Sequence, residues 1–397
     1  MSKIIAVNSG SSSLKFQLFQ MPEEKVLTSG AAERIGLSDC IFTINVNGEK
    51  FKTECPIPDH HTAVDILLNK LIEHGIVKDL SEISGAGHRV VQGGPYYSHS
   101  VKVDDDVIAK VTELSDIAPL HNPAHLVCYK AFKKAVPNIE HVFVFDTAFH
   151  QTMGPESYLF SVPYEWYEKY KVRKYGAHGT SHEYVMKRTA ELMGKKPEDI
   201  NMITCHLGNG ASITAIKHGK SINTSMGLSP LGGIMMGTRC GDIDPTIVYF
   251  MEEKLGCTPQ EMDNYLNKQS GMLGISGISS DSRDIQAAVE QGNERAILTQ
   301  EIYCNRIINV IGGYYMQLGH VDAISFTAGL GEHATTIREG ILKQLEEGMG
   351  VLVDYELNAK THDERKISLP ESMVEVFVVP TNEELVIARD TVEILGL

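Results

Sequence analysis

Three short turns rich in glycine and serine follow apolar segments of the chain that read as buried strands. They are Asn8–Ser13, Gly208–Ser212 and Ala328–Glu332. Successive backbone N–H groups in such a turn, with no large side chains in the way, form a concavity that binds phosphate oxygens. Lys15 follows the first turn and can add a point charge, although a plain hairpin beside a solvated lysine is the alternative for that turn taken alone. Three such turns at strand ends favour a phosphate-binding protein.

Two arginines and one aspartate stand at positions that a periodic pattern does not explain. Arg89 ends a strand that runs into the glycine turn Gly93-Gly94, and Arg239 lies between Gly237 and Gly241. A guanidinium beside flexible backbone suits bidentate recognition of a carboxylate or a phosphate, with a structural salt bridge as the alternative for Arg89. Asp146 follows a buried strand, where a carboxylate commonly serves a metal or a nucleophile, although it could also cap a helix.

Histidines gather in one segment, and their i, i+4 spacing could indicate a metal pair. The segment holds His178 and His182, but Gly179 delays the start of the helix. We therefore interpret His178 as a loop ligand and His182 as a structural residue at a helix N-terminus. Glu383 and Glu384, by contrast, would pass for an ordinary first helical turn.

The better-known nucleotide and metal motifs are missing from the sequence. Gly219-Lys220-Ser221 has Thr214 where a Walker motif needs its first glycine, and neither Gly208-x-Gly210 nor Gly329-x-Gly331 extends to a dinucleotide fingerprint. The sequence also has no protein-kinase catalytic loop and no His-Glu-x-x-His. A nucleotide enzyme with this sequence would use hairpin phosphate loops instead.

The elements that must position these residues alternate between short strands and helices. Amphipathic segments include Thr62–His74, which Gly75 ends, and a segment from Asp284 to about Gln317 that we expect to break near Gly292 and again at Gly312-Gly313. This alternation predicts an α/β fold. The expected buried strands are Ile4–Val7, His141–Phe145, Met202–Cys205, Ala323–Thr327 and Val374–Val379.

The first turn and its flanking strands have an echo about two hundred residues later. Residues 5–16 and residues 204–214 both read as a strand, a small-residue turn and a second strand. The alternative to duplication is that two short Gly/Ser turns are similar by coincidence. The echo predicts a duplicated fold that holds a ligand between its two copies.

Length and composition restrict the class of protein further. The chain has 397 residues, a formal net charge of -15, 42% hydrophobic and 22% charged residues, which favours two or three globular domains and argues against disorder. The acidic balance argues against nucleic-acid binding. Seven scattered cysteines with no Cys-x-x-Cys pair argue against disulfides and zinc, and no apolar run is long enough to cross a membrane. We expect a soluble cytoplasmic protein without a membrane partner.

Taken in order, the motifs resemble those of the acetate/propionate/butyrate kinase family over nearly the whole chain. The segments that carry the resemblance are 8–15, 146–150, 178–182, 206–210, 235–245 and 381–384. The family belongs to the actin/Hsp70/sugar-kinase superfold. The resemblance therefore implies two duplicated actin/Hsp70-like (ribonuclease H-like) α/β domains with an interdomain nucleotide cleft. We expect an N-terminal acyl- and phosphate-binding domain at residues 1–150 plus 383–397, and a nucleotide-binding domain at 151–382.

The resemblance implies a reversible, Mg²⁺-dependent transfer of the γ-phosphoryl group of ATP to acetate, which gives acetyl phosphate and ADP. Mn²⁺ is expected to substitute for Mg²⁺, and a homodimer is implied. Catalytic roles fall on Arg89, Asp146, His178 and Arg239. Arg89 and Arg239 would hold the acetate carboxylate and the migrating phosphoryl group, and His178 would donate to an equatorial phosphoryl oxygen. Asp146 is better suited to organise Mg²⁺ or an arginine than to act as a base, because acetate is already ionised at pH 7.

The remaining roles carried over from the family are binding roles. Asn8 and Glu383 would fix the metal ion. The acyl pocket would comprise Arg89, Val91, Leu120, Ala177 and Pro230. The nucleotide and its phosphates would contact Ser11, Ser13, Lys15, His206, Leu207, Gly208, Asn209, Gly210, Asp281, Ser282, Arg283, Gly329, Leu330, Gly331, Glu332 and His333.

The chain departs from the family pattern at three positions. Ala177 replaces a common phenylalanine, which puts strict acetate selectivity in question, and His333 replaces an asparagine, which does the same for purine preference. Cys240 replaces a common serine and is interpreted as a packing change. Propionate or butyrate kinase activity is the first alternative. A non-catalytic ATP-binding regulatory module is the alternative from another class.

Overall fold

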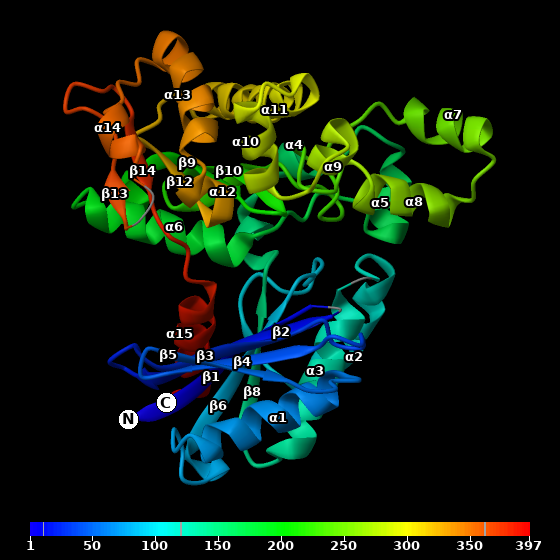
Figure 1. The fold of residues 1–397 in the computed structure, drawn as a ribbon, viewed down its shortest axis with the longest axis vertical. Helices are drawn as coiled ribbons and strands as arrows, with labels where there is room; N and C mark the ends of the chain where they lie inside the picture. Colours follow the sequence, from blue (N-terminus) through cyan, green and yellow to red (C-terminus); the bar gives the residue numbers. More distant parts are fainter. Residues whose placement is uncertain (11, 120, 361–362) are drawn as a thin grey trace. The chain divides into compact units, whose positions relative to one another are not determined.

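The chain forms two compact units, which are described separately (Figure 1). The computed structural model describes residues 1–10, 12–119, 121–360 and 363–397. Unit 1 comprises Met1–Ala148 together with Asn382–Leu397, and unit 2 comprises Phe149–Thr381. The C-terminal segment therefore belongs to the same unit as the N-terminus.

Unit 1 is built on a mixed sheet with the strand order β5-β4-β3-β2-β1-β6-β8-β7. Strands β1 to β5 form an antiparallel meander, β6 is parallel to β1, and β8 is parallel to β6. The C-terminal ends of β1, β6 and β8 therefore meet at one edge of the sheet, where ligands of α/β folds gather. The bounds are β1 (Ser2–Ser9), β2 (Ser13–Met21), β3 (Lys25–Glu33), β4 (Ile41–Val46), β5 (Glu49–Glu54), β6 (Ile83–Val90), β7 (Val101–Lys102) and β8 (Glu140–Phe145).

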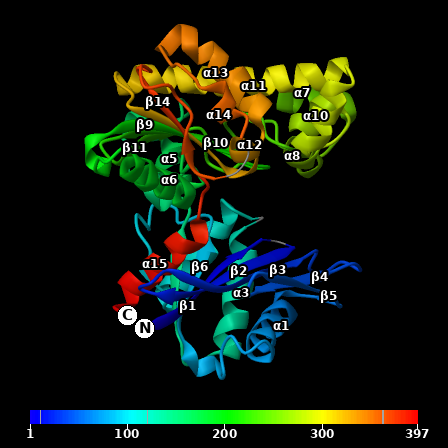
Figure 2. The same cartoon turned by 60° about the vertical axis from the view of Figure 1, so that its left-hand side comes forward.

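Helices cover both faces of this sheet. Figures 1 and 2 show α15 (Glu383–Leu395) beside β1 and β6, while α1 (His60–Glu73) and α3 (Asn122–Ala135) lie on the other side with α2 (Asp105–Glu113) nearby. Successive residues of β6 point to opposite faces. A Cβ on Gly87 would lie 2.3 Å from Thr391 Oγ1 in α15, so glycine permits this close packing. Ala86 faces the opposite core, which contains Leu67 and Phe132. Short 3₁₀ turns are η1 (Leu80–Glu82), η2 (Leu114–Asp116) and η3 (Ala148–Thr152).

Unit 2 is built on a second mixed sheet with the order β11-β10-β9-β12-β14-β13. Strands β9, β10 and β11 form an antiparallel meander, β12 is parallel to β9, and β14 is parallel to β12. The order β3-β2-β1-β6-β8 in unit 1 repeats as β11-β10-β9-β12-β14 in unit 2, with the same strand directions. The duplicated α/β fold predicted from the sequence is confirmed by this repeat. The bounds are β9 (Asn201–Leu207), β10 (Ala211–Lys217), β11 (Lys220–Thr224), β12 (Ala323–Thr327), β13 (Arg365–Lys366) and β14 (Glu375–Val378).

The helices of unit 2 pack against this sheet and against one another. Helix α6 contacts β9 and β12, whereas α11 contacts β9 and β10, and a core that includes Ile213, Ile307 and Phe326 lies beneath α11. The bounds are α4 (Pro155–Tyr158), α5 (Tyr164–Tyr170), α6 (Gly179–Leu192), η4 (Pro197–Asp199), α7 (Thr246–Leu255), α8 (Pro259–Lys268), α9 (Gly271–Ser276), α10 (Ser282–Glu290), α11 (Glu294–Leu318), α12 (Ala328–His333), α13 (Thr335–Met349) and α14 (Tyr355–Asn358).

One predicted helix break is confirmed and the other is wrong. The chain turns at Gly292, which has a φ of +77°, between α10 and α11. Helix α11 continues through Gly312-Gly313 to Leu318. The buried side chains of Ile307, Ile311, Tyr314 and Leu318 recur at helical spacing on both sides of the glycine pair, and their burial outweighs the low helix propensity of glycine.

The predicted strands are all present, and the third predicted turn is a helix. Residues 328–332 form most of α12 rather than an open turn. Ala328, the first residue of α12, has a φ of +64°. Its N–H donates to Glu332 Oε1 over 2.8 Å, so a side chain of the same helix satisfies this N-terminal donor. No helix among the described residues is long and apolar enough to cross a membrane.

Candidate functional site

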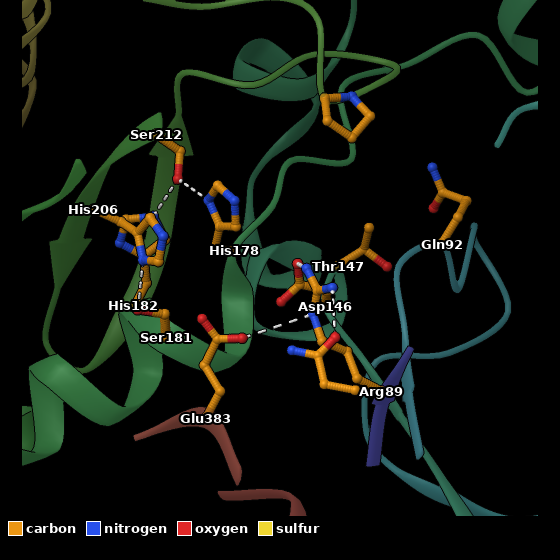
Figure 3. Close-up of polar contacts among 12 residues, drawn as sticks. Arg89, Gln92, Asp146, Thr147, His178, Ser181, His182, His206, Ser212 and Glu383 are labelled. Atoms are coloured by element: carbon orange, nitrogen blue, oxygen red, sulfur yellow. Dashed lines mark hydrogen bonds and ion pairs between the residues drawn. The ribbon is translucent and has the colours of Figure 1, made fainter. Parts of the chain in front are cut away.

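The first group of site residues in unit 1 surrounds the guanidinium of Arg89 (Figure 3). Its Nη2 donates to Asp146 Oδ2 over 2.7 Å, its Nη1 donates to Asn8 Oδ1 over 3.3 Å, and its Nε lies 3.8 Å from Glu383 Oε2. Asn8 ends β1, Arg89 ends β6 and Asp146 follows β8, so three adjacent parallel strands bring these side chains together. Glu383 comes from the first turn of α15. The salt bridge that was the alternative interpretation of Arg89 is therefore present.

The carboxylates of this group share the cation of Arg89, whose side chain is 15% exposed. Burial would lower the pKa of Arg89, but the nearby carboxylates of Asp146 and Glu383 raise it above its usual value. Burial raises the pKa of Glu383 to about 7, and the charge of Asp146 adds to this rise, whereas Arg89 and Lys15 oppose it. Arg89 alone thus leaves the negative charge of the group incompletely compensated, so a further cation would be stabilised there.

Backbone turns on either side of Arg89 are held by side chains. His60 Nε2 lies 2.8 Å from the carbonyl oxygen of Gly10, the residue that follows β1. Lys15 pairs with Asn8 across the β1–β2 hairpin. After β6, the N–H of Gly93 donates to Thr147 Oγ1 over 3.1 Å. Side chains therefore hold the backbone of Gly10, after β1, and of Gly93, after β6.

The second group, in unit 2, contains two stacked imidazoles. The rings of His178 and His206 lie 4.1 Å apart with an interplanar angle of 14°. Nδ1 of His178 is 2.9 Å from Ser212 Oγ, and Nδ1 of His206 is 2.8 Å from Ser181 Oγ (Figure 3). Each imidazole is thus oriented through a serine that binds its Nδ1.

Arg239 lies in the same region of unit 2 and has no carboxylate in ion-pair contact among the described residues. Its Nη1 donates to the carbonyl oxygen of Pro230 over 3.0 Å, and burial lowers its pKa. A Cβ built on Gly210 would lie 3.4 Å from both Arg239 Nη1 and His178 Nε2. A guanidinium and an imidazole therefore converge above a glycine turn, which suits them to bind an anion.

A cavity of about 830 Å³ opens in unit 2 beside these loops. Its walls come from the β9–β10 turn, α9, α10 and the α12–α13 segment, and a cavity of this size accommodates a nucleotide-sized ligand. The lining residues are Gly208, Asn209, Gly237, Met272, Ser280, Asp281, Ser282, Arg283, Gln286, Ala287, Glu290, Gln300, Gly329, Leu330, His333, Ala334, Thr335, Thr336 and Ile337.

The wall formed by α12 is anchored by a buried arginine. Arg338 is fully buried, and its Nη1 donates to the carbonyl oxygen of Gly331 over 2.8 Å. Its Nε and Nη2 donate to the side-chain and backbone oxygens of Asn358. Burial lowers the pKa of Arg338 to about 10. These bonds tie the end of α12 to α14.

The polar residues at the cavity mouth are more exposed. Asp281 accepts hydrogen bonds from the backbone N–H and the guanidinium of Arg283, and the guanidinium bond in particular lowers the pKa of Asp281 to about 2. The side chain of Arg283 is 88% exposed. His333 is also exposed, and its Nε2 lies 3.9 Å from Glu332 Oε2.

The predicted nucleotide residues divide into those that line the cavity and those that do not. Gly208, Asn209, Asp281, Ser282, Arg283, Gly329, Leu330 and His333 line the cavity. His206, Leu207, Gly210, Gly331 and Glu332 are not lining residues, and Ser13 and Lys15 belong to unit 1. Ser11 and Leu120 lie outside the described residues. Among the predicted acyl-pocket residues, Val91 is buried in unit 1, Ala177 packs in the core of unit 2, and the carbonyl oxygen of Pro230 accepts from Arg239.

Several residues that build the site were not selected from the sequence. Ser181 and Ser212 orient the stacked imidazoles, and His182, interpreted as structural, joins Ser212 through its Nε2 over 2.8 Å. Ser212 ends the second predicted phosphate turn, which was the available signal. Arg338 and Asn358 had no signal, because they lie in segments that read as ordinary helix.

A metal site cannot be assigned from acidic, histidine or cysteine ligands alone. Among the described residues, no three such side chains are placed to hold a metal ion together. The predicted metal residues Asn8 and Glu383 both contact Arg89 in unit 1. With Asp146 they supply an amide oxygen and two carboxylates, which are ligands that Mg²⁺ and Mn²⁺ prefer.

Comparison with known proteins gives matches along the whole length of the chain. The model of the Acetokinase family matches residues 3–389. Acetate kinase of Bacillus subtilis is 57% identical over 394 residues, which are 99% of this chain and all of that protein. The crystal structure of Porphyromonas gingivalis acetate kinase matches with a TM-score of 0.94 at 45% identity, covering all of both chains. A propionate kinase from Francisella tularensis matches with the same TM-score at 39% identity, over 99% of this chain and all of that one.

The repeated strand order of the two α/β units, together with the family match and the similar kinases, defines a phosphotransferase of duplicated fold. Both the family match and the relatives cover nearly the entire sequence. The chain belongs to the acetokinase family.

Proposed function

We propose that this protein is an acetate kinase. It transfers the γ-phosphoryl group of ATP to acetate, reversibly and in line, and gives acetyl phosphate and ADP. The proposal is supported by membership of the acetokinase family over residues 3–389 and by 57% identity to an acetate kinase over 99% of this chain and all of that protein.

Transfer of a phosphoryl group to acetate requires positive charge at the site rather than a general base. A simple carboxylic acid such as the glutamate side chain has a pKa of about 4.3, so acetate is an anion at pH 7 and attacks without losing a proton. The obstacle is the approach of this anion to an anionic phosphate. A loose transition state spreads charge over the equatorial phosphoryl oxygens, which preplaced cations and N–H donors stabilise.

Arg239 and His178 meet this requirement in unit 2. The guanidinium of Arg239 has only the carbonyl oxygen of Pro230 and the sulfur of Met236 as hydrogen-bond partners among the described residues, so its charge is available to a ligand. His178 Nε2 faces the same small space above Gly210. We assign the migrating phosphoryl group to this pair, with His178 as a hydrogen-bond donor. This half-buried guanidinium, which has no ion-pair partner among the described residues and lies beside an imidazole, is the single observation that carries the proposal.

Arg89 and Asp146 act together in unit 1. Asp146 is fully buried and holds Arg89 through a 2.7 Å hydrogen bond, so it orients the guanidinium rather than removing a proton. Arg89 then receives the acetate carboxylate, with Val91, Leu120, Ala177 and Pro230 as the apolar residues assigned to the methyl group. Acyl-chain selectivity at Ala177 stays a prediction.

The oxygen ligands beside Arg89 suit a divalent cation. Glu383 has a raised pKa because burial and the Asp146 charge leave its negative charge poorly compensated, and a cation would relieve this. Asn8 and Glu383 are the residues we assign to hold Mg²⁺, with Mn²⁺ as a substitute. When bound, such an ion neutralises charge on the nucleotide phosphates.

The cavity of unit 2 is assigned to the nucleotide. Gly208 and Asn209 contribute backbone from the β9–β10 turn, and Gly329 and Leu330 contribute backbone from α12. Asp281–Arg283 and His333 stand at the cavity mouth, where they are assigned to the adenosine. Purine preference at His333 stays a prediction.

A hydroxylamine trap tests the proposed reaction directly. Purified protein is incubated with ATP, MgCl₂ and acetate, and acetyl phosphate is captured as its hydroxamate. Parallel reactions with propionate and butyrate give relative kcat/KM values, which we expect to be highest for acetate. An added methylene changes such a ratio by roughly 10- to 200-fold at most. No acyl phosphate with any of the three acids would refute the proposal.

We also propose that the protein is a homodimer, and that α7 contributes to the interface. None of the ten residues of α7 is buried, although the helix carries Ile247, Tyr249 and Phe250, which are 44%, 61% and 53% exposed. Such an apolar helix is expected to be covered by a second copy. Tyr249→Lys with Phe250→Glu should halve the mass measured by light scattering, and an unchanged mass would exclude α7. The cytoplasmic location stays a prediction.

A further inference from the structure

A row of hydrogen-bonded side chains leads from the imidazole of His178 through Ser212 to His182 in unit 2 (Figure 3). Ser212 Oγ is 2.9 Å from His178 Nδ1 and 2.8 Å from His182 Nε2. On the far side of the same imidazole, His182 Nδ1 is 2.6 Å from Thr204 Oγ1. Ser212, His182 and Thr204 are all fully buried. The row therefore consists of three consecutive hydrogen bonds that end at the one partly exposed member, His178.

The number of protons in this row restricts how they are arranged. Ser212 has one hydroxyl proton, so it donates in one of its two bonds and accepts in the other. If Ser212 donates to His178 Nδ1, then neutral His182 must donate from Nε2, and its bare Nδ1 accepts from Thr204. If Ser212 donates to His182 instead, all three bonds reverse and Thr204 becomes the acceptor. Neutral imidazoles allow only these two directions.

Thr204 decides between the two directions. Its hydroxyl has His182 as its only hydrogen-bond partner among the described residues. If Thr204 accepted from His182, its own proton would be buried without an acceptor, and an unmade buried bond is costly. If Thr204 donates, each of the three hydrogen bonds has a proton and an acceptor, and no hydroxyl proton of the row is left without a partner.

We propose that Ser212 and His182 are positioning residues that hold neutral His178 with its proton on Nε2. This atom and Arg239 Nη1 both lie 3.4 Å from the point where a Cβ on Gly210 would sit. Because the guanidinium would repel a positive charge on His178, a neutral N–H is the favoured donor at this place. The inference rests on the proposed function, since the phosphoryl group is the anion that this N–H binds.

Paired variants test the role of the row in turnover. Ser212→Ala removes the donor to His178, whereas Ser221→Ala removes an equally buried serine that lies 3.0 Å from Nδ1 of another histidine, His150. For histidines that bind metal ions, loss of the partner on the other ring nitrogen costs roughly 10- to 100-fold, and we take this range as the scale for His178. We expect that loss in kcat for Ser212→Ala, with a much smaller change in the KM for ATP, and near wild-type kcat for Ser221→Ala. Equal effects of the two substitutions would overturn the inference.

A second pair separates positioning from simple packing at His182. The amide nitrogen of His182→Gln can take the place of Nε2 and donate to Ser212, whereas the shorter His182→Asn can replace only Nδ1 and satisfy Thr204. We expect His182→Gln to retain most of the kcat and His182→Asn to resemble Ser212→Ala. The reverse order would contradict the inference.

A spectroscopic measurement tests the proton position without using activity. The ¹⁵N spectrum of histidine-labelled protein, with His178→Gln used for assignment, should show His178 protonated on Nε2 and bare at Nδ1. In Ser212→Ala the two tautomers of His178 should mix. A proton on Nδ1 of His178 in the wild type would refute the inference even if acetyl phosphate is made. A protein that makes no acyl phosphate but shows the Nε2 tautomer would refute the proposed function and leave this arrangement standing.

Discussion

Replacing Arg239 with alanine removes a cation that the fold holds ready for a ligand. In the protein, the guanidinium is held by the carbonyl oxygen of Pro230 and has no ion-pair partner among the described residues. A full charge 4 Å from the charge that develops on a phosphoryl oxygen is worth about 4 kcal/mol at an effective dielectric constant of 20. At about 1.4 kcal/mol for each factor of ten, kcat should fall about 1000-fold. This agrees with the lower end of the range of roughly 10³–10⁵ for arginines in phosphoryl transfer.

The assay is the initial rate of acetyl phosphate formation at saturating ATP and acetate. We expect the KM for ATP to change far less than kcat, because the lost interaction is strongest in the transition state. Arg239→Lys keeps the positive charge but loses the fork of N–H donors, so its kcat should lie between those of the wild type and Arg239→Ala. Arg295→Ala is the matched control, since Arg295 also donates to a backbone carbonyl of unit 2, that of Ile275. Unchanged turnover of Arg239→Ala in folded protein would refute the reasoning.

Three further predictions concern the supports of the site and the stability of the fold. Arg338→Met leaves the carbonyl oxygen of Gly331 without its 2.8 Å donor. The KM for ATP should therefore rise about tenfold, while the KM for acetate stays near that of the wild type. Equal rises in both KM values would argue against a role of Arg338 in the wall of the nucleotide cavity. Gly87→Ala would place a Cβ 2.3 Å from Thr391 Oγ1, and urea unfolding should show a loss of about 1–3 kcal/mol; an unchanged midpoint would mean that α15 can shift freely. Burial lowers the pKa of His141 to about 4, from about 6.5 in the unfolded chain. Because the folded protein favours the neutral imidazole, His141 contributes fully to the free energy of unfolding above pH 6.5, and this contribution is lost as the pH falls toward 4. At pH 5 the lost free energy is about 2 kcal/mol. Between pH 7 and pH 5, the free energy of unfolding should therefore fall by about 2 kcal/mol less in His141→Phe than in the wild type. An equal fall in both proteins would contradict the assignment to His141.

The fold was predictable because its signals are local. Strands such as Met202–Cys205 are apolar runs that end at glycine turns, and the repeated strand–turn–strand segments at residues 5–16 and 204–214 correspond to the hairpins β1–β2 and β9–β10. The break expected at Gly312-Gly313 was wrong because burial of Ile311 and Tyr314 is a tertiary effect that helix propensity does not contain.

The site was predictable only where chemistry-bearing residues stand out from the surrounding pattern. Arg89 and Asp146 each end a strand, and their pairing follows from adjacent parallel strands once the strand order is known. The order of parallel strands is not written in any short segment, so the partners themselves could not be named. Thr204 is a clear case, because an alternating strand residue reads as core and reveals a hydrogen-bonding role only when His182 is placed against it.

The place of α15 in the chain has a consequence for how the protein is made. Unit 2 is one continuous segment, Phe149–Thr381, whereas unit 1 needs residues from both ends of the sequence. Gly85 and Gly87 lie on the face of β6 that α15 covers. During synthesis, this face stays uncovered until residues 383–395 have left the ribosome. Unit 2 can reach its fold earlier, and Glu383 joins Arg89 only after α15 has been synthesised. A ribosome that stalls late in the message would therefore leave an incomplete unit 1 with an exposed sheet, a substrate for chaperones and proteases rather than a partly active enzyme.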